Sequence, residues 1–145
     1  MLRRLIILFM LCATPALANV TNDGRYEWPV LRVVDGDTLD VHLPGLPPEL
    51  QPVKIRVRGI DTPEIRGKCA SEKEMARKAK AFTAGKIEEA QASAQPIAFA
   101  NVDWDKYGGR IDADVAVGGK SLADMLVLAG LARRYDGGKR AGWCR

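Results

Sequence analysis

Apolar and polar residues alternate along several stretches of the chain, a pattern typical of β-strands that bury one face. Val53, Ile55 and Val57 alternate with charged residues, and residues 110–117 repeat the alternation. Apolar and β-branched residues also fill 28–34 and 38–43, and these two segments flank an Asp-Gly pair. Because Asp-Gly favours a tight hairpin turn, the two segments are predicted to pair. With the apolar run that follows Pro96 and ends at Val102, the pattern predicts five strands.

Two segments have helical rather than alternating spacing. Ser71-Glu72-Lys73-Glu74 fits a capping box, which predicts a helix start at Ser71. Apolar residues then recur on one face over about five turns, as an amphipathic helix requires: Met75, Ala79, Phe82, Ile87 and Ala90. A shorter helix is predicted from Ser121 to Ala129, ended by Gly130. Residues 131–145 are expected to be mostly coil.

These elements predict a single domain of the α+β class that is mainly β. Prolines within 44–52 forbid regular structure there and indicate a surface loop. Five strands with an interposed helix are the elements of an OB-fold, a five-stranded barrel that commonly binds nucleic acid, here with two helices packed on it. A chain of 145 residues has room for one such core.

The first 18 residues are predicted to be a signal peptide. Arg3 and Arg4 precede an apolar run over 5–13, and Ala16-Leu17-Ala18 has the small-x-small pattern of a cleavage site. A membrane anchor is the alternative, but the run is shorter than the roughly 20 residues that span a bilayer. We therefore expect an exported protein, periplasmic or secreted, without stable membrane association after cleavage. Residues 19–27 then form a loose lead-in, and 28–145 form the domain.

Cleavage changes the charge and leaves two cysteines. Loss of Arg3 and Arg4 lowers the formal net charge from +4 to +2. The last thirteen residues hold five Lys and Arg against Asp136, which indicates either a solvated basic tail or a surface that attracts a polyanion. The remaining cysteines, Cys69 and Cys144, meet an oxidising compartment, where paired thiols usually close. A Cys69–Cys144 disulfide is predicted.

The candidate catalytic and binding residues lie between Val33 and Glu64, where charged residues follow the ends of short apolar strands. Asp37 and Asp61 offer the oxygen ligands that calcium prefers, and Glu64 is a candidate base for an attacking water. The guanidinium group of an arginine can donate two parallel hydrogen bonds to the oxygens of one phosphate. Acids for a cation together with arginines therefore suggest hydrolysis of phosphodiester bonds. Strict alternation places Arg56 and Asp61 on opposite faces, so the strand must end or bulge at Gly59 if both serve one site.

Taken singly, several charged residues of this region have common structural roles. Asp35 in an Asp-Gly pair is commonly a turn former, and Arg58 an outward strand residue. The single histidine, His42, excludes mechanisms that need paired imidazoles.

Taken together, the motifs resemble the staphylococcal nuclease family. The resemblance runs from Val30 to about Ala132 and rests on four motifs: Asp35-Gly36-Asp37-Thr38, Arg56, Asp61-Thr62-Pro63-Glu64 and Asp105-Lys106-Tyr107-Gly108 with a following arginine. It implies an OB-type five-stranded barrel with helices. It also implies hydrolysis of both DNA and RNA, with cleavage of the bond to the 5′ oxygen and 3′-phosphate products, and we expect a monomer.

The resemblance also implies roles for individual residues. One calcium ion would be held by Asp37, Asp61 and the backbone carbonyl of Thr62, with Glu64 handling the attacking water. Arg56 and Arg110 would grip the phosphate. Lys106 and Tyr107 match positions where the family contacts nucleotide phosphate.

The chain departs from the family pattern in three places. Tyr107-Gly108-Gly109-Arg110 has one more glycine than the usual Tyr-Gly-Arg, so a bulge is expected to re-aim Arg110. The lysine-rich loop after the glutamate is shortened to 66–69, and a third C-terminal helix is missing. The family's base-packing tyrosines have no counterpart beyond the nearby Tyr135. Two alternatives therefore remain: a non-catalytic nucleic-acid or protein-binding module, and a calcium-stabilised structural domain of the cell envelope.

Overall fold

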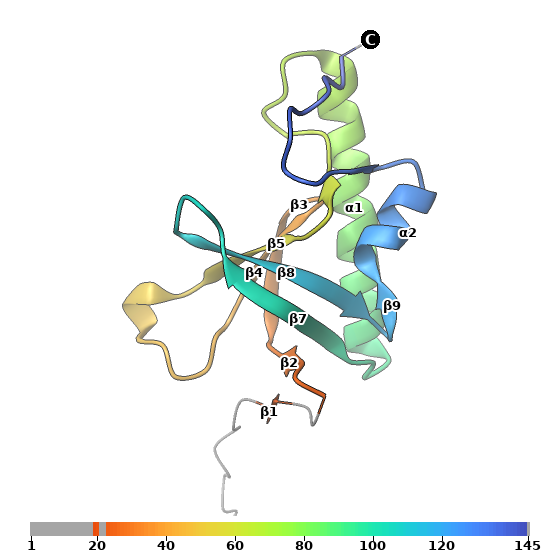
Figure 1. The fold of residues 1–145 in the computed structure, drawn as a ribbon. Coiled ribbons are helices and arrows are strands. Elements are labelled where there is room, and N and C mark those ends of the chain that lie inside the picture. Colours follow the sequence, from red (N-terminus) through yellow and green to blue (C-terminus); the bar gives the residue numbers. More distant parts are fainter. Residues whose placement is uncertain (1–18, 21–22, 145) are drawn as a thin grey trace, which may run out of the picture.

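Five main strands curl into a half-barrel that two helices flank (Figure 1). The structure is a computed structural model, and it describes residues 19–20 and 23–144. The main strands are β3 (Val30–Asp35), β4 (Thr38–Val41), β5 (Val53–Val57), β7 (Ile97–Trp104) and β8 (Arg110–Val117). They follow the order β7-β8-β5-β4-β3, with β5 parallel to β8 and the other neighbours antiparallel. The predicted strands and the mainly-β class are confirmed.

Short elements complete the sheet and form a second one. A single-turn helix, η1 (Pro48–Leu50), lies in the predicted proline-rich loop. β9 (Lys120–Ser121) pairs with β8. β6 (Ile60–Asp61) and β10 (Arg133–Arg134) make a separate two-stranded sheet. Residues 131–144 are otherwise mostly coil, as predicted, and β10 gives this segment backbone hydrogen bonds to β6.

The lead-in 19–27 also contributes to the sheet. It contains β1 (Asn19–Val20) and β2 (Tyr26–Glu27), which pair with one another, and β2 pairs with β7. Tyr26 stacks on Trp28 with ring centroids 4.8 Å apart, so this end of the lead-in is packed rather than loose. The predicted signal peptide, 1–18, lies outside the described residues. In the part of the chain that the structure describes, neither helix is long and apolar enough to span a membrane.

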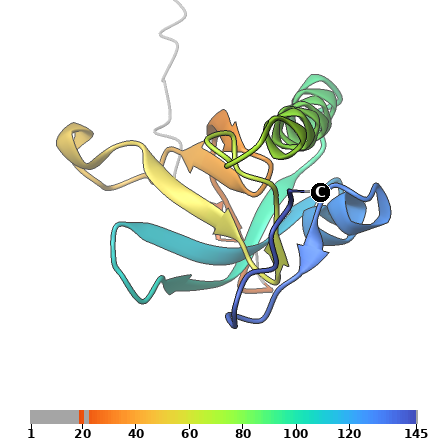
Figure 2. The same cartoon turned by 90° about the horizontal axis from the view of Figure 1, so that it is seen from above.

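The core lies between the curled sheet and the helices α1 (Ala70–Ala92) and α2 (Leu122–Leu128). Side chains from alternate strand positions and from α2 fill it with no exposure to solvent: Leu39, Ile55, Phe99, Leu122 and Leu126. Looking along α1, Figure 2 shows the helix beside the half-barrel, and Cys144 is joined to Cys69 at the start of this helix.

The start of α1 differs from the predicted capping box. The helix begins at Ala70 with Cys69 as N-cap, so Ser71 already lies in the first turn. Glu72, rather than Glu74, reaches back, and its Oε2 accepts the backbone N–H of Lys68 at 2.8 Å. The prediction that Ser71 caps the helix is therefore wrong, because the chain enters the helix two residues earlier.

The buried face of α1 carries small residues that let it approach the β3–β4 turn. A Cβ added to Gly36 would lie 2.7 Å from the Ala79 Cβ, so the turn needs glycine there. The Thr83 hydroxyl donates to the Gly36 carbonyl at 2.7 Å. Met75 and Phe82, predicted to be buried, are only partly so. This close packing fixes the position of Asp35 and Asp37 on either side of Gly36.

Candidate functional site

Three buried charged side chains meet beside the end of β5: Arg56 on β5, Asp37 in the turn between β3 and β4, and Asp61 on β6. Arg56, on β5, lies opposite Thr38 of β4. Its Nη1 is 3.0 Å from Asp37 Oδ2, and its Nη2 is 3.8 Å from Asp61 Oδ1. Nη2 also donates to the Ile60 carbonyl at 3.0 Å. Buried charges need such partners, so Arg56 holds the two carboxylates beside one another.

The turn after β5 brings Asp61 to the same side as Arg56. β5 ends at Val57, and Gly59 has a φ of +77°, a conformation that glycine adopts without steric cost. The chain then reverses into β6, which carries Asp61. The prediction that the strand ends at Gly59 is confirmed.

Each of the two carboxylates also accepts hydrogen bonds that fix its orientation. Asp37 Oδ1 accepts from the Thr38 hydroxyl at 3.0 Å, and Oδ2 accepts from the Thr62 backbone N–H at 3.2 Å. Asp61 Oδ2 accepts from the indole N–H of Trp143 at 3.1 Å. Asp37 thus contacts Thr62 directly, and Arg56 links Asp37 to Asp61.

Glu64 lies at the open side of this group. Its side chain is 52% exposed, and Oε1 accepts from Arg140 Nη1 at 2.9 Å. Arg140 Nε is 3.3 Å from Asp61 Oδ1, so one guanidinium links Glu64 to Asp61. Burial alone would lower the pKa of Arg140, but the charges of Asp61 and Glu64 raise it.

Asp35 adds a fourth carboxylate, which the sequence analysis interpreted as a turn residue. Burial, followed by the charges of Glu64 and Asp37, raises the pKa of Asp35. Of the buried side-chain oxygens and nitrogens in the described segments, only Asp35 Oδ1 and Asp112 Oδ1 lack a hydrogen-bond partner. An unpartnered carboxylate oxygen among mutually repelling carboxylates is the environment that a bound cation stabilises.

The donor set fits a hard divalent cation. All the candidate ligands near Asp37 are oxygens, which calcium prefers, and no imidazole or thiol lies among them. Among the described residues, the acids and cysteines whose ligand atoms all lie within 4.8 Å of one another are not those near Asp37 but Cys69, Glu72 and Cys144. The two sulfurs are joined in a disulfide, so that group does not offer thiolates to a metal.

A cavity of about 500 Å³ includes Arg56 in its lining, together with several other positively charged side chains. Its lining includes Arg56, Lys106, Tyr107, Arg110, Tyr135 and Arg140. Arg110 is oriented by Asp105, whose Oδ2 lies 2.7 Å from Arg110 Nε. Lys106 and Tyr107 are exposed at this cavity. Guanidinium, ammonium and phenol donors around one cavity match phosphate oxygens.

The additional glycine before Arg110 is accommodated without the expected bulge at that residue. Gly108 and Gly109 both have positive φ, 71° and 88°, in the hairpin loop between β7 and β8. The Asp105 N–H donates to the Arg110 carbonyl at 3.1 Å, so pairing resumes at Arg110 itself. Arg110 therefore lies with Arg56 in the cavity lining.

The C-terminal segment, residues 133–144, forms one wall of the site. β10 pairs with β6, with Arg133 opposite Asp61. The Arg133 guanidinium stacks on the Trp143 ring, 3.7 Å from its centroid. Arg134 pairs with Asp124. Arg133, Arg134 and Arg140 all have intramolecular partners, so these basic side chains hold the segment against the domain, although residues 136–142 are exposed.

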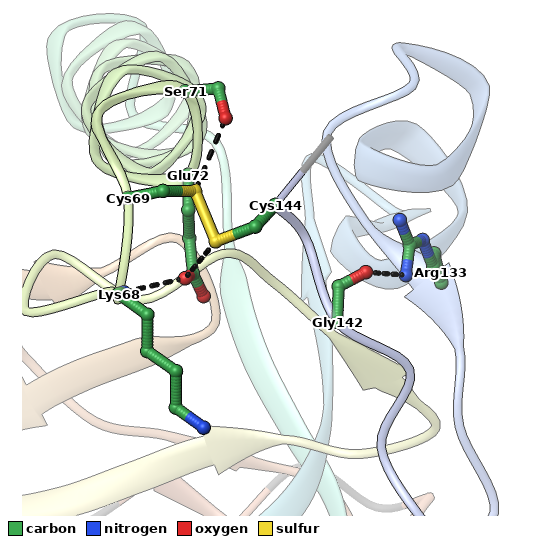
Figure 3. Close-up of a disulfide and its surroundings, with 7 residues drawn as sticks. All are labelled: Lys68, Cys69, Ser71, Glu72, Arg133, Gly142 and Cys144. Atoms are coloured by element: carbon green, nitrogen blue, oxygen red, sulfur yellow. Dashed lines mark hydrogen bonds between the residues drawn. A yellow bond between two sulfur atoms is a disulfide. The ribbon is translucent and has the colours of Figure 1, made fainter.

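A disulfide ties this segment to the start of α1. Cys69 and Cys144 are joined with their Cα atoms 5.9 Å apart, as the sequence predicted (Figure 3). A second cavity, of about 360 Å³, lies between the segment and the acids, and Glu64, Arg140 and Trp143 contribute to its lining. The predicted disulfide was the one sequence signal that residues near Cys144 lie close to Glu64.

Comparison with known proteins identifies the domain. A family model described as "Staphylococcal nuclease homologue" matches residues 54–141, more than half of the chain. The matched region includes Arg56, Asp61, Glu64, Arg110 and Arg140, whereas Asp37 lies before it. No curated protein matches the chain.

Proposed function

Because the chain belongs to the staphylococcal nuclease homologue family, we propose that it is a calcium-dependent nuclease that hydrolyses DNA and RNA. One observation carries this proposal. Buried Arg56 contacts both Asp37 and Asp61, and Glu64 is joined to the same group through Arg140. The site thus combines acids that can bind a cation, a candidate base, and guanidinium groups that can bind phosphate. It lies beside the cavity lined by positively charged side chains.

Asp37, Asp61 and the backbone carbonyl of Thr62 are proposed to hold one calcium ion. Asp35 adds negative charge close to them and favours cation binding at this position. When bound, calcium supplies a Lewis acid that polarises a phosphoryl oxygen.

Side chains of the protein carry out the proton transfer and stabilise the charge that develops during hydrolysis. Glu64 accepts a proton from a water molecule as the water oxygen bonds to phosphorus. The bond from phosphorus to the 5′ oxygen breaks, and the leaving 5′ oxygen takes a proton from solvent water, which leaves a 3′ phosphate and a 5′ hydroxyl. Arg56 and Arg110 stabilise the negative charge that develops on the phosphoryl oxygens. Lys106 and Tyr107 bind a neighbouring phosphate at the edge of the cavity.

This arrangement accounts for the broad substrate class. The proposed contacts are made to phosphate, which carries no sequence information. DNA and RNA share that group, so both are accepted as substrates and sequence preference is weak.

We further propose that the protein acts as an exported monomer, in a periplasm or outside the cell. The sequence of residues 1–18 supports export, and a disulfide is the expected product of an oxidising compartment. N-terminal sequencing of the exported protein is expected to begin at Asn19; a chain that retains residues 1–18 would contradict cleavage after Ala18.

The reaction is tested by analysing the products. Single-stranded DNA and RNA of defined sequence are incubated with the protein and calcium, and the masses of the fragments are measured by mass spectrometry. Fragments with 3′ phosphates, absent when a chelator replaces calcium, are expected for both polymers. Products with 5′ phosphates would contradict the proposed bond cleavage. Binding of DNA without any cleavage would instead favour a non-catalytic binding module.

A further inference from the structure

Arg140 is the one described side chain that contacts both Glu64 and Asp61. Its Nη1 lies 2.9 Å from Glu64 Oε1, and its Nε lies 3.3 Å from Asp61 Oδ1. It also lines both cavities of the site. A guanidinium is planar and offers its donors in a fixed fork, so two contacts set the separation and orientation of two carboxylates.

Glu64 depends on this contact more than Asp61 does. Asp61 is buried and also contacts Arg56 and Trp143. Glu64 is half-exposed on the loop after β6, and its carboxylate has no other hydrogen-bond partner among the described residues. Without Arg140, an exposed glutamate side chain would sample several rotamers.

The fold holds Arg140 in place from both directions along the chain. On its N-terminal side, β10 pairs with β6. On its C-terminal side, Trp143 is buried, with 7% of its surface exposed, and Arg133 covers its ring. Arg133 Nη1 donates to the Gly142 carbonyl at 2.9 Å, and Cys144 is joined to Cys69 (Figure 3). The segment that carries Arg140 is therefore anchored at both ends.

We infer that Arg140 is a positioning residue, held by the Cys69–Cys144 disulfide, which orients Glu64 toward Asp61 for proton abstraction. This inference rests on the proposed function. It predicts two effects of opposite sign when Arg140 is replaced. Turnover falls because Glu64 loses its orientation, whereas calcium binding tightens because a positive charge beside Asp61 is removed.

The test compares Arg140→Ala with Lys139→Ala. Lys139 is the adjacent residue, has the same charge, is exposed and has no contact with either carboxylate among the described residues. Arg140→Ala is expected to lower kcat by roughly tenfold or more with KM nearly unchanged, because misplacing a reacting group costs rate. Calorimetry should show calcium binding about two- to fivefold tighter, the size of a partly exposed charge interaction. Lys139→Ala should change neither value by more than about twofold.

Two further variants separate positioning from folding. Arg140→Lys keeps the charge, so calcium affinity should return to that of the wild type while kcat recovers only in part. The Cys69→Ser, Cys144→Ser double variant should also lower kcat, but by less than Arg140→Ala, because β10 and Trp143 still hold the segment when the disulfide is lost. A double variant with wild-type kcat would contradict the role given to the disulfide.

The outcomes distinguish this inference from the proposed function. A wild-type protein that cleaves nothing with calcium bound would contradict the function itself. An active wild type in which Arg140→Ala keeps its kcat would contradict only the role of Arg140. A loss of both turnover and calcium affinity in Arg140→Ala would also overturn the inference, because it would indicate a general disturbance of the site.

Discussion

The charges of Glu64 and Asp37 repel the carboxylate of Asp35. The three acids differ in whether an arginine neutralises them. Asp37 is paired with Arg56 and Glu64 with Arg140. Asp35 Oδ1 has no hydrogen-bond partner, and burial together with the two other acids raises the pKa of Asp35. For an acid, a raised pKa means that the ionised form destabilises the fold at neutral pH, and that this cost disappears as pH falls below about 3.9.

Asp35→Asn is therefore predicted to stabilise the calcium-free protein. At neutral pH the free energy of unfolding should rise, because asparagine carries no charge to be desolvated or to be repelled by Glu64 and Asp37. Calcium affinity should fall, because a negative charge near Asp37 is lost. Denaturant unfolding and calorimetry measure the two effects, and exposed Asp103→Asn serves as the control. A variant that is less stable without calcium, or that binds calcium as tightly as the wild type, would contradict this assignment.

At the scale of elements, a charged row across β3, β4 and β5 supports the strand that delivers Asp37. Asp40, fully buried on β4, lies opposite Arg32 of β3 and Lys54 of β5. Arg32 Nη2 is 2.6 Å from Asp40 Oδ2, and Lys54 Nζ is 2.8 Å from Oδ1. Burial pushes the pKa of Asp40 upward, but the hydrogen bonds and charges of Lys54 and Arg32 outweigh it and lower the pKa.

Asp40→Asn is predicted to destabilise the protein in a pH-dependent way. A lowered pKa means that the ionised Asp40 stabilises the fold above its ordinary pKa of about 3.9, and that this contribution is lost as pH falls through the lowered value. At pH 7 the loss should be about 1–2 kcal/mol, since both basic partners are partly exposed. Denaturant unfolding from pH 7 down to pH 3 should show the difference from wild type shrinking. A difference that stays constant over this range would contradict the ionic origin of the effect.

Local patterns predicted most of the elements because they depend on neighbours in sequence. Alternation identified β5 and β8, and Ser121 capped α2 as expected, with its hydroxyl accepting the Asp124 N–H. The capping box failed because a sequence motif does not show where the chain enters a helix. Asp35 was missed as a site residue because Asp-Gly pairs are common in turns without chemical function.

At the scale of the whole molecule, the site depends on contacts between distant residues. Arg140 is 76 positions from Glu64, and Trp143 is 82 positions from Asp61. Hydrophobic periodicity and turn preferences depend on neighbours in sequence, so they do not predict contacts between residues this far apart. The paired cysteines gave the one long-range constraint, and it indicated correctly that the C-terminal segment returns to the region after Glu64. The half-barrel supplies Asp37 and Arg56, the small β6–β10 sheet supplies Asp61, and the disulfide-linked segment lies against Glu64.

The central claim is that the assembled group hydrolyses phosphodiesters with Glu64 as the base. The most direct test measures cleavage of single-stranded DNA by residues 19–145, with calcium and with a chelator, beside Glu64→Gln. Glutamine keeps the size of the side chain but does not accept a proton from water. Cleavage that requires calcium and falls at least about 100-fold in Glu64→Gln, which still binds calcium, is the predicted result. A Glu64→Gln variant with wild-type turnover would contradict the account.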